Sequence, residues 1–62
     1  MTLNLEPNIP DPDDFYDELL AAHQGLDKSD SDAFNARLVL ILANHIGDRQ
    51  ILTQALTAAK TG

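Results

Sequence analysis

The sequence predicts an all-α protein of three short helices, at about residues 12–24, 28–46 and 49–60, preceded by an extended arm over residues 1–10. Three observations predict this fold. Apolar residues recur at spacings of three and four, the three prolines fall within the first twelve residues, and Asp or Gly marks the boundaries of the apolar segments. The second helix is the longest and most apolar, so residues 11–62 are predicted to form one small helical domain around it.

The length of the chain limits how much core it can bury. A chain of 62 residues buries only roughly 60% of the surface that it exposes when unfolded. Domains of this size usually depend on disulfides, a metal or oligomerisation, and the sequence has no cysteine. We therefore expect this chain to depend on self-association or on a partner protein.

The predicted arm carries more apolar side chains than a solvated tail needs. Leu3, Leu5 and Ile9 stand among polar residues, and the prolines favour an extended backbone. The arm is therefore expected to lie in a groove, either on its own helices or on another chain. A frayed terminus is the alternative.

The first predicted helix has a recognisable start and end. Asp11 is expected to cap it by accepting from free N–H groups of the first turn, and Pro12 suits the first helical position. Gly25 is expected to end it in a Schellman motif, with Leu26 folding back onto the helix. Its apolar stripe contains Phe15, Leu19 and Ala22, flanked by Tyr16, Leu20 and His23.

The second predicted helix is apolar on almost every side. Asp27 is expected to cap its start, Gly47 to end it, and residues 38–43 are all apolar. Its apolar arc spans roughly 260°, whereas a surface helix facing a core shows roughly 100° or more. Two short helices could cover most of that arc, so the remainder must face another chain or the arm. Its narrow polar line consists of Asp30, Arg37 and Asn44.

Asn35 is a polar residue inside this apolar arc. If its amide is buried it must find partners, because an unsatisfied amide costs about 1–3 kcal/mol. It could fix the register of a helix interface, or it could bond to the loop between the first two helices, which is the reading that we favour.

The third predicted helix is an ordinary amphipathic one. Asp48 follows Gly47 directly and is expected to cap it. Its apolar face contains Ile51, Leu52, Ala55, Leu56 and Ala59.

The residues that could carry chemistry are better explained by structure. His23 and His45 each stand two residues before a helix-ending glycine, where a histidine interacts favourably with terminal carbonyls and the helix dipole. The alternative, a metal site of both histidines with Asp48, matches no known ligand spacing. Acids of the first helix share a solvated face, where burial cannot raise a pKa. We therefore predict no catalytic, metal or cofactor-binding residue and a chain that is not an enzyme.

The charge of the chain is unevenly distributed. The net charge is −6, and residues up to Asp32 hold nine acids and one lysine. Such an acidic half disfavours nucleic acid and anionic lipid and suits a basic protein surface, although it could equally be a solubilising surface.

The opening residues lack the basic and apolar regions of a secretory signal, and no apolar run reaches the roughly 18 residues of a membrane span, so a cytoplasmic location is expected.

Two segments resemble a known family. FYDELLAAHQGL, from Phe15, and FNARLVLILANHIGD, ending at Asp48, resemble a family of small bacterial proteins known only as the domain of unknown function numbered twenty-seven eighty-three. Genes of this family tend to lie beside those of flavin-dependent aromatic hydroxylases. The resemblance implies a small subunit or chaperone of such an enzyme in aromatic degradation, and it supplies no catalytic residues.

These observations predict a noncatalytic accessory or stabilising subunit of a larger enzyme, namely a flavin-dependent aromatic-ring monooxygenase. One alternative is a helical homodimer of structural or regulatory role, and another is a small acidic regulator that masks a basic protein partner. A metal-dependent enzyme comes last. The predicted partner-binding residues are Leu3, Leu5, Ile9, Leu38, Val39, Leu40, Ile41 and Leu42.

Overall fold

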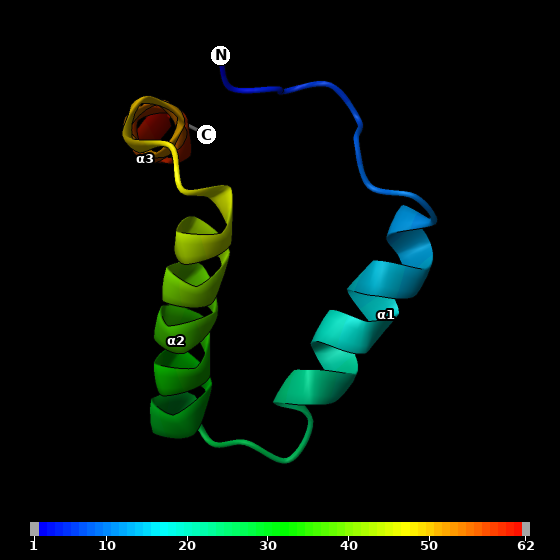
Figure 1. The fold of residues 1–62 in the computed structure, drawn as a ribbon. Coiled ribbons are helices and arrows are strands. Elements are labelled where there is room, and N and C mark those ends of the chain that lie inside the picture. The colour runs from blue at the N-terminus through cyan, green and yellow to red at the C-terminus, as the bar shows by residue number, and fades with distance from the viewer. Residues whose placement is uncertain (1, 62) are drawn as a thin grey trace.

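A computed structural model describes residues 2–61 of the chain as three α-helices joined by short connections (Figure 1). They are α1 (Pro12–His23), α2 (Lys28–Ile46) and α3 (Arg49–Thr61), and the described residues contain no strand. The predicted all-α class is confirmed, with α1 ending one residue earlier and α3 one residue later than expected. Met1 and Gly62, which the predicted bounds of the arm and the domain include, lie outside the described residues.

The helices are arranged openly around the arm. In Figure 1, α1 and α2 diverge from their connection, α3 is seen end-on beyond the C-terminal end of α2, and the arm crosses from α3 to α1. The backbone N–H of Leu3 donates to Oε1 of Gln54 at 2.8 Å. The arm therefore contacts a helix of its own chain, which was one of the two predicted alternatives for a docked arm.

The start of α1 differs from the prediction. Asp11 adopts a left-handed backbone conformation (φ 48°, ψ 60°), and its side chain makes no capping hydrogen bond. Its carbonyl oxygen instead accepts from the N–H groups of Asp14 (3.1 Å) and Phe15 (3.2 Å). The expected side-chain cap is wrong because a capping residue normally has extended φ and ψ, which aim its side chain at the first turn. Aspartate is among the few residues that tolerate the left-handed region.

The end of α1 is a type II turn and not the expected Schellman motif. Gln24 is extended (φ −63°, ψ 130°), Gly25 has φ 83°, and the N–H of Leu26 donates to the carbonyl of His23 at 3.1 Å. A type II turn requires positive φ at its third residue, which is the conformation that glycine supplies. The extended Gln24 ends the helix before the 6→1 hydrogen bond of a Schellman motif can form.

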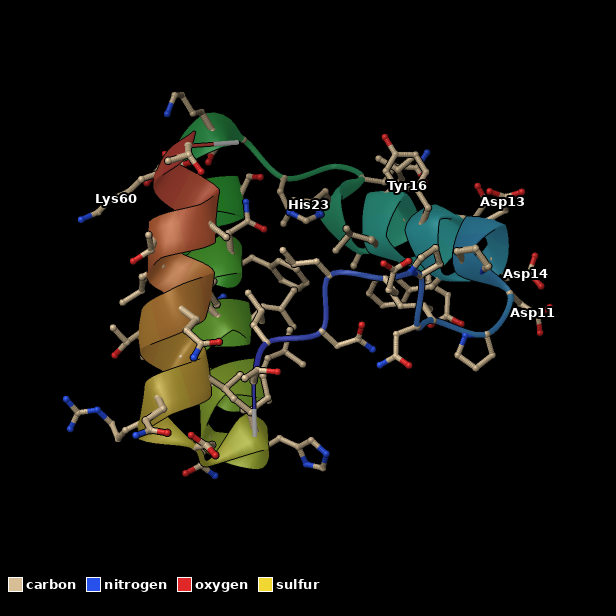
Figure 2. All side chains as sticks on the ribbon, turned by 90° about the horizontal axis from the view of Figure 1, so that it is seen from above. Asp11, Asp13, Asp14, Tyr16, His23 and Lys60 are labelled. Carbon is tan, nitrogen blue, oxygen red and sulfur yellow. The ribbon has the colours of Figure 1, made fainter. Side chains whose placement is uncertain are left out.

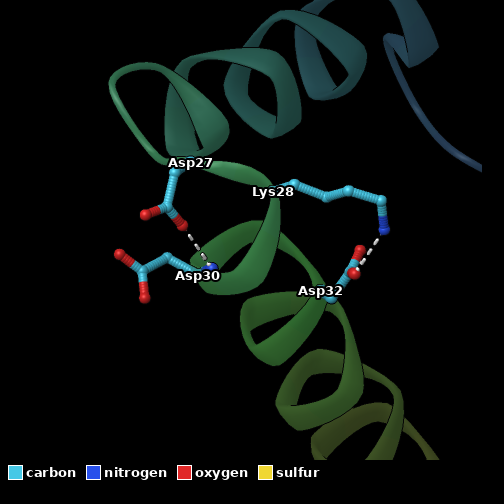
Figure 3. Close-up of polar contacts among 4 residues, drawn as sticks. All are labelled: Asp27, Lys28, Asp30 and Asp32. Atoms are coloured by element: carbon cyan, nitrogen blue, oxygen red, sulfur yellow. Dashed lines mark hydrogen bonds and ion pairs between the residues drawn. The ribbon is translucent and has the colours of Figure 1, made fainter.

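The start of α2 is capped as predicted. The Asp27 carboxylate accepts from the N–H of Asp30 at 2.8 Å, and Lys28 pairs with Asp32 at 2.8 Å (Figure 3). The cap satisfies one of the free N–H groups of the first turn. Both partners of the ion pair are largely exposed, so the pair contributes little to stability.

Gly47 and Asp48 join α2 to α3 without an intervening loop. Gly47 has φ 67°, and its N–H donates to the carbonyl of Ala43 at 3.0 Å. The Asp48 carboxylate accepts from the N–H groups of Gln50 (2.9 Å) and Ile51 (3.1 Å). Both predicted roles are confirmed, and one helix passes into the next through a glycine C-cap and an aspartate N-cap.

The described chain has almost no core. Ile51, at 9% exposure, is the only buried residue among residues 2–61, and no two helices of this part of the chain pack closely along their length. The radius of gyration is 13.3 Å, whereas a compact chain of this length has about 11 Å. The helices are therefore well formed individually but leave most of their apolar surface uncovered.

Candidate protein-binding surface

The second half of α2 exposes large apolar side chains in several directions. Val39 is 63% exposed, Leu40 70% and Ile41 64%, and Leu42 and Ile46 are also exposed. Successive residues of a helix point about 100° apart, so these side chains surround the helix. The all-round apolar surface predicted from the sequence is present, and no other part of the described chain covers it.

One side of α2 is partly sheltered, and we call it the inner face, comprising Phe34, Leu38, Ile41 and Leu42. Phe34 and Leu38 are half-buried, and Phe34, Arg37, Leu38 and Ile41 line a small hollow of about 140 Å³. Leu38 is thus less accessible than the other predicted partner-binding residues of α2. Ile41 and Leu42, at the edges of this face, remain exposed.

The opposite side of α2 is the outer face, which we define as Ala33, Ala36, Val39, Leu40 and Ala43. These residues fall within about 120° of one another around a helix of 3.6 residues per turn. All are exposed except Ala43, which is half-exposed. The predicted partner-binding residues of α2 therefore divide between two faces, with Val39 and Leu40 on the outer one.

The predicted arm residues also divide. Leu3 is half-buried beside its hydrogen bond to Gln54, whereas Leu5 (79% exposed) and Ile9 are exposed. Leu5 and Ile9 are free to contact another molecule, and Leu3 serves to hold the arm against α3.

The apolar stripe of α1 is a further exposed surface. Phe15, Tyr16 and Leu20 are exposed, and only Leu19 is half-buried. The sequence predicts that two short helices could cover most of the apolar arc of α2, whereas α1 leaves its own stripe exposed. The periodicity shows only that the stripe is apolar, and it cannot reveal that α1 diverges from α2 instead of packing along it.

His23 holds the junction between α1 and α2. Its Nδ1 lies 2.8 Å from the carbonyl oxygen of Leu19, its Nε2 lies 2.8 Å from Oδ1 of Asn35, and its ring meets that of Phe34 edge-on at 4.7 Å. The Leu19 carbonyl and, second, the Asn35 amide oxygen raise the pKa of His23, although partial burial opposes them. Both oxygens accept, so the doubly protonated ring satisfies both contacts.

This geometry decides between the readings of Asn35 and His23. Asn35 bonds to the last turn of α1 and not to the loop, so its partner differs from the expected one while its structural role stands. His23 contacts a carbonyl near the end of its own helix, as the structural reading predicted.

The other candidate ligands are not brought together. Asp48 uses its carboxylate to cap α3, and His45 lies in the last turn of α2. No group of three or more His, Cys, Asp or Glu side chains within residues 2–61 is placed to hold a metal ion. A second hollow, of about 450 Å³, is open to solvent and lined by Arg49, Gln50, Thr53 and Gln54, and none of these residues is a carboxylate or histidine.

Three of the acidic residues mark one end of the molecule. Asp11, Asp13 and Asp14 project from the first turn of α1, on the side away from α2 and α3 (Figure 2). Only Lys28 opposes the nine acids of the segment up to Asp32, and its ammonium is paired with Asp32. These three acids therefore lie away from the apolar outer face of α2, whereas Asp32 lies at the N-terminal end of that face.

The described helices are too short or too polar to span a membrane, and the chain matches a protein family. None of the helices within residues 2–61 combines the length and apolar character needed to cross a bilayer. No curated protein and no solved structure matches the chain. One family model, described as "Protein of unknown function (DUF2783)", matches residues 3–61. Since this match covers nearly the whole sequence, the chain belongs to the DUF2783 family.

Proposed function

We propose that this chain is a noncatalytic accessory or stabilising subunit that binds a larger enzyme, and that this enzyme is a flavin-dependent aromatic-ring monooxygenase. The observation that carries the first part is the exposure of apolar side chains around α2 and along α1. Contiguous apolar surfaces of this kind are typical of protein-binding sites.

The accessible area supports a need for a partner. The chain exposes 5,581 Å², whereas a compact monomer of 6.8 kDa exposes about 4,000 Å². Ordering each residue costs roughly 1–2 kcal/mol of conformational free energy, and a single buried side chain offsets very little of it. Binding to another protein would supply the missing burial.

The inner face of α2 and the apolar stripe of α1 are the surfaces that we assign to the enzyme. The junction at His23 joins them, because His23 belongs to the same side of α1 as Leu19 and contacts Phe34 on the inner face. Leu5 and Ile9 of the arm add a second contact. The identity of the enzyme class rests on the family resemblance, through the neighbouring genes, and not on the geometry.

Co-expression tests the proposal directly. A flavin-dependent aromatic hydroxylase from the same host is produced with and without this chain, and its soluble yield, flavin content and activity are compared. We expect the chain to copurify with the enzyme and to raise its soluble yield. An enzyme that does not retain the chain and gains nothing from it would contradict the proposal.

A pair of variants locates the contact. Ile41→Glu places a charge on the inner face of α2 and is expected to abolish copurification. Leu56→Glu makes the same kind of change at an equally exposed position on α3 and is expected to leave copurification intact. Equal losses in both variants would point to general destabilisation.

A small acidic regulator of a basic protein is the second candidate function, favoured by the acidic segment up to Asp32. Salt distinguishes it from the first candidate, because exposed charges are screened within about 10 Å at 0.1 M ionic strength. Binding that collapses when salt is raised favours the acidic regulator, whereas binding that persists favours the apolar contact.

A further inference from the structure

The apolar surface of α2 is too wide for one occupant. The inner face is assigned above to an enzyme, but Val39 and Leu40 point to the other side of the helix and are among its most exposed side chains. Around them stand Ala33, Ala36 and Ala43, and the one charged side chain on this side of the helix, Asp32, lies at its N-terminal end and is paired with Lys28. A second occupant is needed to cover it.

We propose that the outer face of α2 binds the same face of a second copy of this chain, with the two α2 helices antiparallel about a two-fold axis near residue 38. Such an interface is self-complementary, because each residue meets a residue of the same set on the other copy. In this register Leu40 of each copy lies over Ala36 of the other.

The uncovered area matches what a stable dimer needs. The chain exposes about 1,600 Å² more than a compact monomer of its mass. Part of this excess lies on the surfaces assigned above to the enzyme. If each of two chains buries half of it, the interface covers about 1,600 Å² in total, the size typical of a stable, specific interface. The exposed side chains beside the outer face contribute to it as well.

The small side chains of the outer face permit close contact between the helices. Ala33, Ala36, Leu40 and Ala43 follow one another at spacings of three, four and three, which keeps them on one line of a helix. Alanine allows helix axes to approach toward the lower end of the usual 8–10 Å separation. The two leucines then fill the space that the alanines leave.

Charge selects the antiparallel orientation. The start of α2 holds Asp27, Asp30 and Asp32 against the single cation of Lys28, whereas the charges of Asp48 and Arg49 cancel at the far end. A parallel pair would place two acidic ends together, which is unfavourable. An antiparallel pair places each acidic end beside the far end of the other copy and opposes the two helix dipoles.

Sedimentation of the full chain, purified alone at micromolar concentration, tests the proposal. We expect about twice the chain mass of 6.8 kDa. Leu40→Glu is expected to weaken self-association at least tenfold, whereas Leu56→Glu, at a similarly exposed position on α3, retains the dimer. A monomeric wild-type chain, or equal weakening by the two variants, overturns the proposal.

A distance measurement covers the case in which Leu40→Glu fails to fold. The sequence has no cysteine, so Ser29→Cys gives a single site for a nitroxide spin label. In the antiparallel dimer the two labels are separated by about 27 Å along the helix axes, from 18 residues at about 1.5 Å each. A short distance, as in a parallel pair, or no dipolar coupling overturns the proposal.

The outcome is separable from the proposed function. A chain that is monomeric alone and still copurifies with a flavin-dependent hydroxylase refutes the dimer and leaves the accessory role standing. A dimer that binds no such enzyme refutes the accessory role and leaves the dimer standing.

Discussion

The second half of α2 and the whole of α3 are neighbouring helical segments with opposite relationships to the rest of the chain. In α3 most of the apolar residues lie on one side, where Ile51 is buried and Leu52, Ala55 and Ala58 are half-buried, although Leu56 is 65% exposed. In α2 the apolar residues lie on all sides, and none is fully buried. One neighbouring element can bury a one-sided apolar stripe, but it cannot bury apolar residues on all sides of a helix.

The difference concerns how far each helix's apolar residues are covered within the chain. Apart from Leu56, the sequence of α3 is explained by contacts within this chain. The sequence of residues 38–42 is not, since a surface helix of a lone monomer would carry polar residues where Val39 and Leu40 stand. The exposed apolar residues of α2 are therefore the observation on which the proposals of an enzyme partner and of a second copy rest.

Two isoleucine substitutions compare these segments most directly, and the largest effect is expected here. Ile51→Ala removes the one buried side chain of the described residues and should lower the free energy of unfolding by about 2–4 kcal/mol. Ile41→Ala, at the exposed edge of the inner face of α2, should change it by no more than about 0.5 kcal/mol. Urea unfolding followed by far-UV circular dichroism measures both. Equal losses would mean that α2 is covered in the isolated chain.

A glycine substitution at the turn after α1 tests a requirement that is purely local. Gly25→Ala should lower the free energy of unfolding by about 1–2 kcal/mol, because φ 83° is strained for a residue with a Cβ. No atom lies within 4 Å of the added Cβ, so the cost comes from the backbone alone. Gly25→Asn should recover part of the loss in thermal unfolding. If alanine is tolerated at no cost, the positive φ does not persist in solution.

Substitutions of two aspartates that precede helices distinguish a cap made by a side chain from one made by a backbone carbonyl. Asp27→Ala should lower the free energy of unfolding by about 1 kcal/mol, because it removes the hydrogen bond to the N–H of Asp30. Asp11→Ala should cost less than about 0.5 kcal/mol, because the side chain of Asp11 makes no such bond. Matched chemical denaturation curves decide the order. A larger loss at Asp11 would restore the cap that the sequence predicted.

The junction at His23 should give a small effect that depends on pH. Folding raises the pKa of His23 above its ordinary value of 6.5, so the folded chain holds this proton more tightly than the unfolded chain. The resulting stabilisation is complete below about pH 6.5 and is lost as pH rises through the raised pKa.

A ring-proton NMR titration checks the His23 prediction by reading the pKa, and amide exchange in α1 reports the opening of the junction. His23→Gln should remove this pH dependence, whereas the matched change His45→Gln should retain it. A His23 pKa at or below 6.5 would contradict the contacts with Leu19 and Asn35.

The sequence predicted the parts of the fold that depend on neighbouring residues. The helix boundaries, the Asp27 and Asp48 caps and the helix-ending glycine at 47 all follow from local chemistry, and the structure agrees. The predictions of a side-chain cap at Asp11 and of a Schellman motif at Gly25 were wrong, because these residue types are compatible with several backbone conformations. In both places the chain closes its turn through backbone carbonyls, which a sequence pattern cannot distinguish.

The candidate surface was predictable only in part. The width of the apolar arc indicated that α2 would stay uncovered, and the exposure of Val39, Leu40 and Ile41 agrees. The half-burial of Leu38, the exposed stripe on α1 and the bond from Leu3 to Gln54 depend on the angles between helices. Those angles arise from contacts between distant residues and leave no periodic signal in the sequence.

The turn at Gln24 and Gly25 sets the direction of the whole of α1. The helix is about 18 Å long at 1.5 Å per residue, so a rotation of about 10° at the turn carries its far end through about 3 Å. Beside the turn itself, the angle is held by the contacts of one imidazole with Asn35 and Phe34. A rotation at this turn would therefore change the spacing of the apolar surfaces on α1 and α2 with every helix kept intact.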